Sequence, residues 1–147
     1  MFLEDSFSVD AGVDQVWAFL QDIPRLCACI PGVEEVTEID PDTYQGVLKV
    51  KVGPLSAKFS GQVRIVEREA MKRMVALVEG EDKASASFAK ATFTGRLSAQ
   101  GKRTRLEYET EISLRGRLAQ FGLTVIRGTV KNMTREFVQN TQEALNS

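Results

Sequence analysis

Histidine is absent from all 147 residues of the sequence. Its absence removes the commonest general base, the usual zinc sites and the Ser/His and Cys/His nucleophile pairs. No apolar run approaches the roughly 18 to 20 residues that span a bilayer, and the N-terminus carries acids where a signal peptide would carry bases. We therefore expect a cytoplasmic protein that is not an enzyme and that holds neither a metal nor a cofactor.

Cysteine is scarce, and its two copies, Cys27 and Cys29, are separated by a single residue. That spacing suits neither a CxxC redox pair nor a structural disulfide, so a reduced state in the cytoplasm is the simpler interpretation. A reactive thiol would need a nearby base or a helix N-terminus. We expect both cysteines to be small buried apolar residues.

The net charge of −1 hides an uneven distribution along the chain. Residues 1–42 hold ten acids and one base, whereas residues 43–147 hold ten acids and eighteen bases. If the two sets kept separate faces, the resulting dipole would orient the molecule against a partner or an anionic membrane. We favour the alternative that the sets interleave in space, because folded sheets mix their strands. No nucleic-acid partner is expected.

The length fits one domain over residues 1–147. A first strand is predicted at Phe2–Val9, followed by a helix with Asp10 as its N-cap. A second short helix is predicted at Arg25–Ile30, with Pro24 in its first turn. The inner face of the first helix is predicted to comprise Val13, Val16, Trp17 and Leu20.

From Val33 onward the apolar period changes to two, which predicts strands joined by tight turns. The six predicted strands are Val33–Ile39, Tyr44–Val52, Leu55–Ile65, Arg73–Gly80, Ser85–Ala99 and Thr104–Leu114. Each strand is amphipathic, so the sheet should have one apolar face and one wet face.

The last stretch, Arg117 to Leu145, is predicted to be one helix of about 29 residues, or roughly 43 Å. Its proposed apolar to small stripe comprises Leu118, Phe121, Gly122, Val125, Thr129, Met133, Phe137 and Leu145. A stripe of that length needs a sheet to lie on. The predicted fold is therefore α+β: a curved antiparallel sheet of about seven strands wrapped around a long C-terminal helix, with two short helices after the first strand.

Small residues recur at the inward strand positions, and they leave two possibilities open. They are Gly46, Ala57, Gly61, Ala76, Ala89 and Ala91, expected to face Gly122 and Thr129 on the helix. They either leave a cavity between sheet and helix or allow close packing at ordinary density. We favour the cavity, because the sheet is long and curls around one helix.

Several segments resemble a known family. The runs CIPGVEEV (Cys29–Val36), VKVGPLSAKFSGQVRI (Val50–Ile65), GRLAQFG (Gly116–Gly122) and VWAFLQD (Val16–Asp22) resemble the signature segments of the carbon monoxide dehydrogenase G-subunit family. That family belongs to the START-like (SRPBCC) helix-grip superfamily of hydrophobic-ligand binders. The resemblance implies a deep apolar cavity, and a role beside a molybdenum hydroxylase in maturation, membrane recruitment or the carriage of a membrane-derived quinone.

The expected occupant of such a cavity is a lipid or an isoprenoid quinone. The expected walls are Leu48, Val50, Phe59, Val63, Met74, Leu106, Phe121, Val125 and Met133. Tyr108 is the candidate polar contact for the ligand, because a buried hydroxyl needs a partner; Thr129 would serve that need equally well. The expected mouth comprises Leu26, Cys29 and Ile30 together with the turn at Gly53 and Pro54.

Two other functions stay open. The acidic N-terminal third, including Glu34, Glu35 and Glu38, would dock an oxidoreductase complex if the chain were an assembly factor. A small-molecule cyclase or hydrolase is less favoured, because the sequence has no histidine. Glu34 and Glu35 are adjacent on a strand and should point to opposite faces, so they are not expected to form an acid/base pair at one site. The Gly53-Pro54 turn lacks the strand-to-helix context of a phosphate loop.

A membrane partner is expected to be transient. Longer members of the family continue into a tail that engages the membrane, and this sequence ends at Ser147 without one. The remaining basic residues near the last helix would each contribute about 1 kcal/mol at an anionic surface. They are Arg115, Arg117, Arg127, Lys131 and Arg135. Peripheral contact at the inner face of the membrane is the alternative to a wholly cytoplasmic location.

Overall fold

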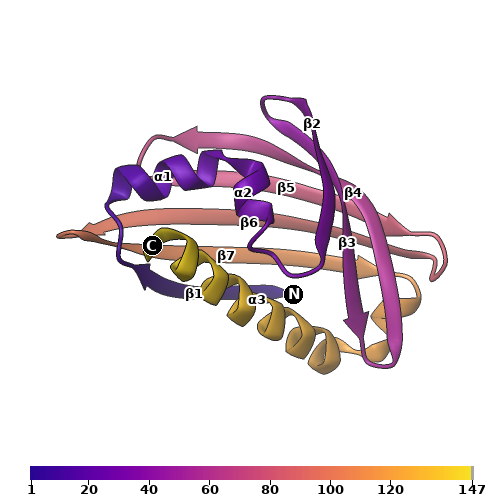
Figure 1. Ribbon diagram of the computed structural model, residues 1–147. Helices are drawn as coiled ribbons and strands as arrows, with labels where there is room; N and C mark the ends of the chain where they lie inside the picture. The colour runs from indigo at the N-terminus through magenta and orange to yellow at the C-terminus, as the bar shows by residue number, and fades with distance from the viewer. Residues whose placement is uncertain (147) are drawn as a thin grey trace.

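A single antiparallel sheet of seven strands, in the order β1-β7-β6-β5-β4-β3-β2, dominates the computed structural model, which describes residues 1–146 (Figure 1). Its strands are β1 (Phe2–Val9), β2 (Val33–Asp40), β3 (Thr43–Val52), β4 (Leu55–Glu69), β5 (Arg73–Asp82), β6 (Ser87–Gln100) and β7 (Arg103–Arg115). Neighbours in sequence pair as hairpins, except that β1 pairs with β7. The acidic N-terminal third is thereby split between the two opposite edges of the sheet.

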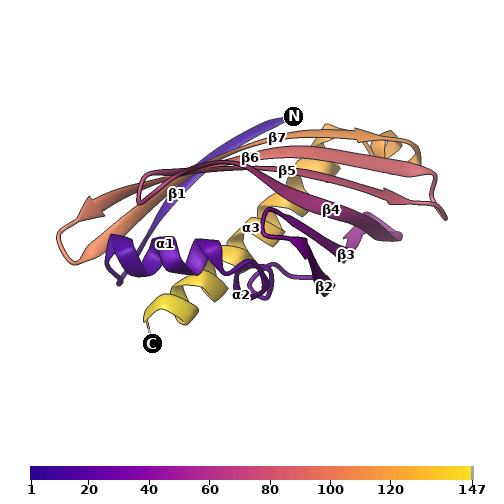
Figure 2. The same cartoon turned by 90° about the horizontal axis from the view of Figure 1, so that it is seen from above.

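The helices are α1 (Val13–Gln21), α2 (Ile23–Cys27), the 3-10 helix η1 (Arg117–Phe121) and α3 (Leu123–Asn146). Figure 2 shows that α1, α2 and α3 lie on the same side of the curved sheet. Within residues 1–146, no helix lies on the opposite face. The predicted α+β fold, a curved antiparallel sheet around a long C-terminal helix, is confirmed.

Three apolar clusters hold the helices to the sheet. The first joins β1 and α1 to β6 and β7 through Val9, Val16 and Leu106. The second joins α2 to β3, β4 and β5 through Ile23 and Tyr44. The third joins the β3–β4 hairpin to η1 and α3 and is centred on Leu118, which is fully buried.

The predicted single long helix is wrong at its start. The chain forms η1, breaks at Gly122 with φ 87°, and only then begins α3. The break resets the helical phase, so Ile126 is buried whereas Val125 is 39% exposed. The buried stripe of α3 therefore runs through Ile126 and Thr141, not through Val125.

Local signals at the short helices also differ from the prediction. The N-cap of α1 is Gly12, whose backbone N–H donates to Gln15 Oε1 at 3.2 Å, and not Asp10. Helix α2 begins earlier than predicted, at Ile23, and Asp22 caps it through a 3.3 Å hydrogen bond from the Arg25 N–H. Strand β4 extends four residues beyond its predicted end at Ile65.

Helix α3 is tied down at its two ends. Near its C-terminus, Asn140 Nδ2 donates to the Cys29 carbonyl at 3.0 Å and Gln142 Nε2 donates to the Ser8 carbonyl at 3.0 Å. Before its start, the Leu118 N–H donates to the fully buried Ser87 Oγ at 3.1 Å. Within residues 1–146, the side-chain hydrogen bonds of the intervening stretch stay inside the helix. The middle of α3 thus spans the sheet on apolar contacts alone.

Candidate functional site

The middle of the helix-covered sheet face is incompletely filled. Phe93 on β6 pairs in register with Ala76 and Thr110, both buried, so its side chain points to the same face as theirs. Nevertheless Phe93 is 41% exposed. The inward apolar residues beside it belong to none of the three clusters; they are Val78, Ala91 and Ile112.

Gly95, two residues further along β6, faces the same unfilled space. It pairs with Met74 and Tyr108 on the helix-covered face. A Cβ built on Gly95 would meet no heavy atom within 4 Å, apart from its own chain neighbours. We call the region over Phe93, Gly95 and Tyr108 the inner region.

The polar group of the inner region is the Tyr108 hydroxyl. Its oxygen is shielded from solvent and has no hydrogen-bond partner among residues 1–146. The alternative partner, Thr129, instead donates to the Val125 carbonyl at 3.2 Å. The ring of Tyr108 lies edge-on to the ring of Phe7, and their centroids are 6.1 Å apart. The ring of Phe7 in turn lies edge-on to the ring of Phe137 in α3, and those centroids are 6.4 Å apart. An aromatic bridge therefore connects the sheet to the helix beside this hydroxyl.

Burial, with a smaller contribution from the charge of Asp5, raises the pKa of Tyr108 to about 12. The hydroxyl is therefore protonated at neutral pH, and it can donate a hydrogen bond. An unpaired buried hydroxyl is unfavourable by about 1–3 kcal/mol. The inner region thus combines apolar walls with one donor that lacks an acceptor.

The predicted wall residues are distributed over the three clusters around the inner region. Leu106 lies in the first cluster, Val63 and Met74 border the second, and Phe59 belongs to the third. Leu48, Val50 and Phe121 pack against the third cluster. Met133 is half-buried on α3 and Val125 faces outward. Their role in ligand binding stays a prediction.

The two parts of the predicted mouth lie near opposite ends of α3. Leu26 and Cys29 are packed near its C-terminal third, where the Cys29 carbonyl accepts from Asn140; Ile30 is half-buried beside them. Gly53 and Pro54 form the exposed tip of the β3–β4 hairpin, and the Phe121 ring lies 3.4 Å from where a Gly53 Cβ would be. They do not meet as one opening.

The predicted strand Ser85–Ala99 contains Phe93 and Gly95, but alternation alone offered no reason to include either residue in the site. The signal that could have indicated the inner region is Gly95 itself, an inward glycine beside the large residues Met74 and Tyr108, because a glycine leaves space at its position.

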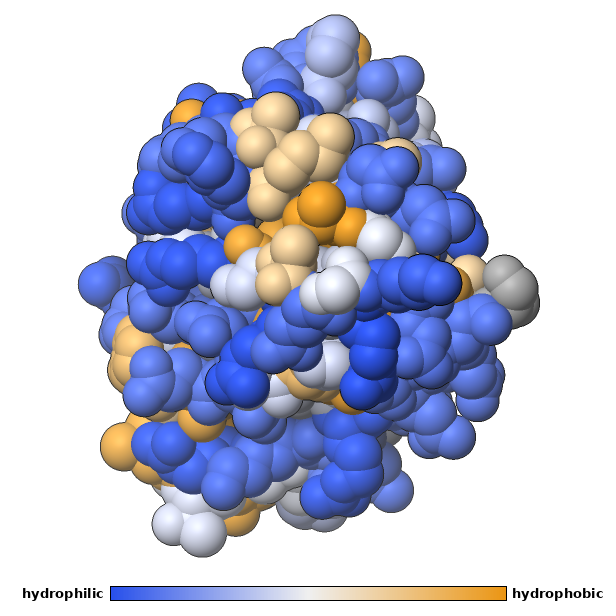
Figure 3. All heavy atoms as spheres, turned by 90° about the vertical axis from the view of Figure 1, so that its left-hand side faces the viewer, coloured by the Kyte–Doolittle hydropathy of each residue, from blue (hydrophilic) through white to orange (hydrophobic). Residues whose placement is uncertain are grey.

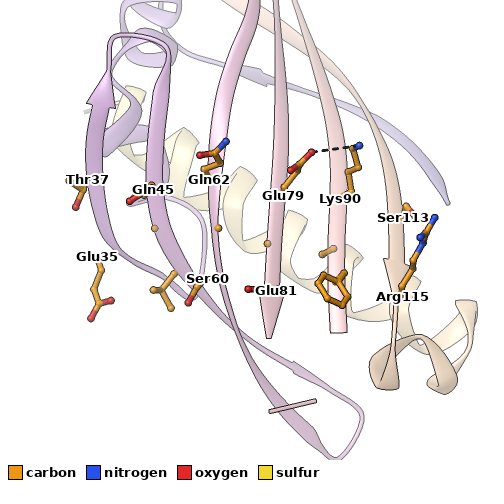
Figure 4. A pocket seen from close by; sticks show the side chains of 16 residues that line it. Glu35, Thr37, Gln45, Ser60, Gln62, Glu79, Glu81, Lys90, Ser113 and Arg115 are labelled. Carbon is orange, nitrogen blue, oxygen red and sulfur yellow. Dashed lines mark ion pairs between the residues drawn. The ribbon is translucent and has the colours of Figure 1, made fainter. Parts of the chain in front are cut away.

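A groove of about 1020 Å³ lies on the helix-free face of the sheet (Figure 4). Its floor is the backbone of Gly46, Gly61 and Gly80, which are neighbours in register. A Cβ at Gly61 would lie 1.9 Å from the Glu79 carbonyl oxygen, so only glycine fits there. Polar side chains line both sides of this groove, which we call the outer groove.

The expectation that Glu34 and Glu35 point to opposite faces is wrong. The register of β2 against β3 shifts between Glu34 and Thr37, and Glu35 takes φ 58°. This bulge turns Glu35 into the outer groove, while Glu34 pairs with the outward Lys49 at 3.0 Å. A bulge adds a residue to one strand and so reverses the alternation locally.

The metal-ligand residue types and the two cysteines are the remaining candidates for chemistry. Residues 1–146 contain no group of three or more acids, cysteines or histidines placed to hold a metal ion. Cys27 and Cys29 are both buried, and burial raises the pKa of the Cys27 thiol to about 11. Both behave as the small apolar residues that were expected.

Figure 3 shows apolar side chains reaching the surface, framed by hydrophilic residues, at the end of the molecule where α1 begins and α3 ends. Among the described helices, none is long and apolar enough to cross a membrane.

The sequence and the structure were compared with those of known proteins. A family model for the G subunit of carbon monoxide dehydrogenase (CoxG) matches residues 6–146. No curated protein sequence matches the chain.

Several solved structures share the fold. A conserved protein from Geobacillus kaustophilus is similar with a TM-score of 0.90 and 22% identity, over 99% of this chain and 95% of that one. A START superfamily protein from Mycobacterium smegmatis is similar with a TM-score of 0.76 and 8% identity, over 98% of this chain and 96% of that one. At these identities the likeness shows the fold alone.

Proposed function

The chain belongs to the carbon monoxide dehydrogenase G-subunit (CoxG) family, and on that premise we propose that it is a non-enzymatic carrier of an apolar small molecule. The ligand lies between the sheet and α3, over the inner region. It is an isoprenoid quinone or a lipid, carried in support of a molybdenum hydroxylase and taken up during transient contact with a membrane.

The observation that carries this proposal is the exposure of Phe93. An aromatic side chain on the covered face of a sheet normally packs against the covering helix, yet Phe93 keeps 41% of its surface accessible. An apolar ligand over this position would bury that surface. Covering about 300 Å² of apolar surface contributes roughly 7 kcal/mol, before the ordering of ligand and protein is subtracted.

Tyr108 supplies the one directional contact that such a ligand requires. A quinone carbonyl or a lipid ester oxygen accepts a hydrogen bond and donates none, which matches a neutral hydroxyl without an acceptor. The inner region thus suits a molecule with a long apolar body and an oxygen acceptor.

The first test is native mass spectrometry of the protein purified from its own host, followed by organic extraction. A near-stoichiometric quinone or lipid is expected. Protein that arrives empty and takes up neither added quinone nor added lipid would overturn the proposal.

A matched pair of variants locates the ligand. Gly95→Leu places a side chain in the inner region where no atom lies within 4 Å, so it should fold normally and lose the ligand. Thr94→Leu alters the adjacent residue, which faces the other side of the sheet, and should keep the ligand. Equal ligand retention by both variants would place the binding site elsewhere.

A further inference from the structure

The outer groove is built from two rows of side chains, one that crosses six strands and one that crosses five. In register from β2 to β7, the first row is Thr37, Gln45, Gln62, Glu79, Lys90 and Ser113. The second row, from β3 to β7, is Val47, Ser60, Glu81, Phe88 and Arg115. Between them run the glycines of the floor, so the groove is a track perpendicular to the strands (Figure 4).

In the part of the chain that the structure describes, most of the polar side chains along this track lack a hydrogen-bond or ion-pair partner in the protein. Within residues 1–146, the side chains of Gln45, Gln62 and Ser60 make no hydrogen bond to another protein group, and the pair Glu79–Lys90 at 3.6 Å is the one ion pair between lining residues. Amide side chains both donate and accept, which suits them to the N–H and C=O groups of a peptide backbone.

The two ends of the track carry opposite charges. Glu35, held in the groove by the strained bulge of β2, has no ion pair among the described residues, and neither has Arg115 at the β7 end. Beside Arg115 lies its register partner Phe88, which is 54% exposed. Exposed aromatic and arginine side chains are the residue types that anchor protein partners.

The length of the track sets the size of its occupant. Six strands are separated by five spacings of about 4.8 Å, which gives roughly 24 Å. An extended chain advances about 3.3 Å per residue, so about seven residues fill the groove. A neutral oligosaccharide of that length would have no charge to match either Glu35 or Arg115.

We propose that the outer groove binds an extended segment of a partner protein, about seven residues long, with an acidic side chain at the Phe88–Arg115 end and a basic side chain at the Glu35 end. The docking face is then the one opposite α3, so a partner bound there leaves the inner region and its covering helix free. This proposal does not depend on what the inner region carries.

The probe is a randomised library of peptides about seven residues long, panned against the full chain and counter-selected against Ser60→Trp, which fills the middle of the groove. Enriched peptides should place an acid near one end and a base near the other. In fluorescence polarisation, Arg115→Glu should weaken their binding about fivefold to twentyfold. Changing the peptide acid to lysine should restore it.

Lys102→Glu makes a comparable change of charge in the exposed β6–β7 turn, outside the groove, and should leave binding unchanged. Circular dichroism and thermal melting of each variant establish that it is folded. The proposal is overturned if no charge pattern is enriched, if Arg115→Glu binds the peptides as well as the unmodified chain does, or if a glycan array is bound and peptides are not.

Discussion

Tyr108→Phe is expected to stabilise the ligand-free protein and to weaken ligand binding. The substitution removes only the hydroxyl oxygen, which is shielded from solvent and lacks a hydrogen-bond partner among the described residues. Removing an unpaired buried hydroxyl recovers its desolvation penalty, about 1–3 kcal/mol. For a chain of this size that gain raises the melting midpoint by roughly 2–12 °C.

The same substitution removes the donor that the ligand oxygen would accept from. Loss of one neutral hydrogen bond is worth about 0.5–1.5 kcal/mol, which weakens affinity roughly 2-fold to 12-fold. Because burial raises the pKa of Tyr108 to about 12, the hydroxyl stays a donor over the neutral and mildly alkaline range. The loss of affinity should therefore be the same throughout that range.

Tyr44→Phe is the matched control. The Tyr44 hydroxyl donates to Glu38 Oε1 at 3.3 Å, so removing it should lower stability by about 0.5–1.5 kcal/mol, the opposite sign. Urea unfolding of the extracted, ligand-free proteins measures both effects, and calorimetric titration with a quinone measures affinity. If Tyr108→Phe destabilises the free protein as Tyr44→Phe does, the hydroxyl already has a partner and the reasoning fails.

Three further predictions concern stability measured by urea unfolding. Gly61→Ala should lower the free energy of unfolding by more than about 2 kcal/mol, because the new Cβ would lie 1.9 Å from a carbonyl oxygen. Gly95→Ala, whose new Cβ meets nothing within 4 Å, should raise the free energy of unfolding by up to about 1 kcal/mol. Equal effects of the two substitutions would contradict the packing described for these glycines. Ser87→Ala leaves the buried Leu118 N–H without its acceptor and should cost about 1–3 kcal/mol; a neutral result would mean that η1 is held otherwise. The pKa of Cys27 is raised from 9.0 to about 11, so between these pH values the folded protein keeps a proton that the unfolded chain releases. The free energy of unfolding should therefore fall as the pH rises from 9.0 to about 11. Cys27→Ala should remove the part of this decrease that is due to the thiol.

Much of the fold could be predicted because most of the strands alternate apolar and polar residues. Leu55 to Ile65 of β4 shows an unbroken period of two, and the structure buries the inward residues Ala57, Phe59 and Ile65. The break at Gly122 was missed because glycine is tolerated inside helices at about 1 kcal/mol. The stripe through Leu118 and Val125 also looked continuous across it. Its true phase, with Ile126 buried, depends on a backbone turn that periodicity does not report.

The inner region was less predictable, because it is the space that the three apolar clusters leave open between the sheet and the helices. Sequence indicates that Phe93 points inward, but its exposure depends on how far α1, α2 and α3 reach over the sheet. The outer groove was missed for a different reason. Strict alternation cannot report an extra residue in β2, so Glu34 and Glu35 were expected on opposite faces of the sheet.

The glycine row links the two sites physically. Gly46, Gly61 and Gly80 are neighbours in register, and the close approach of Gly61 to the Glu79 carbonyl shows how tightly β4 and β5 meet there. The three glycines occupy inward positions of their strands, and their backbone forms the floor of the outer groove on the opposite face. A larger residue in this row would therefore disturb both sites together. Gly95→Leu and Ser60→Trp each change one face, so they separate ligand carriage from partner docking.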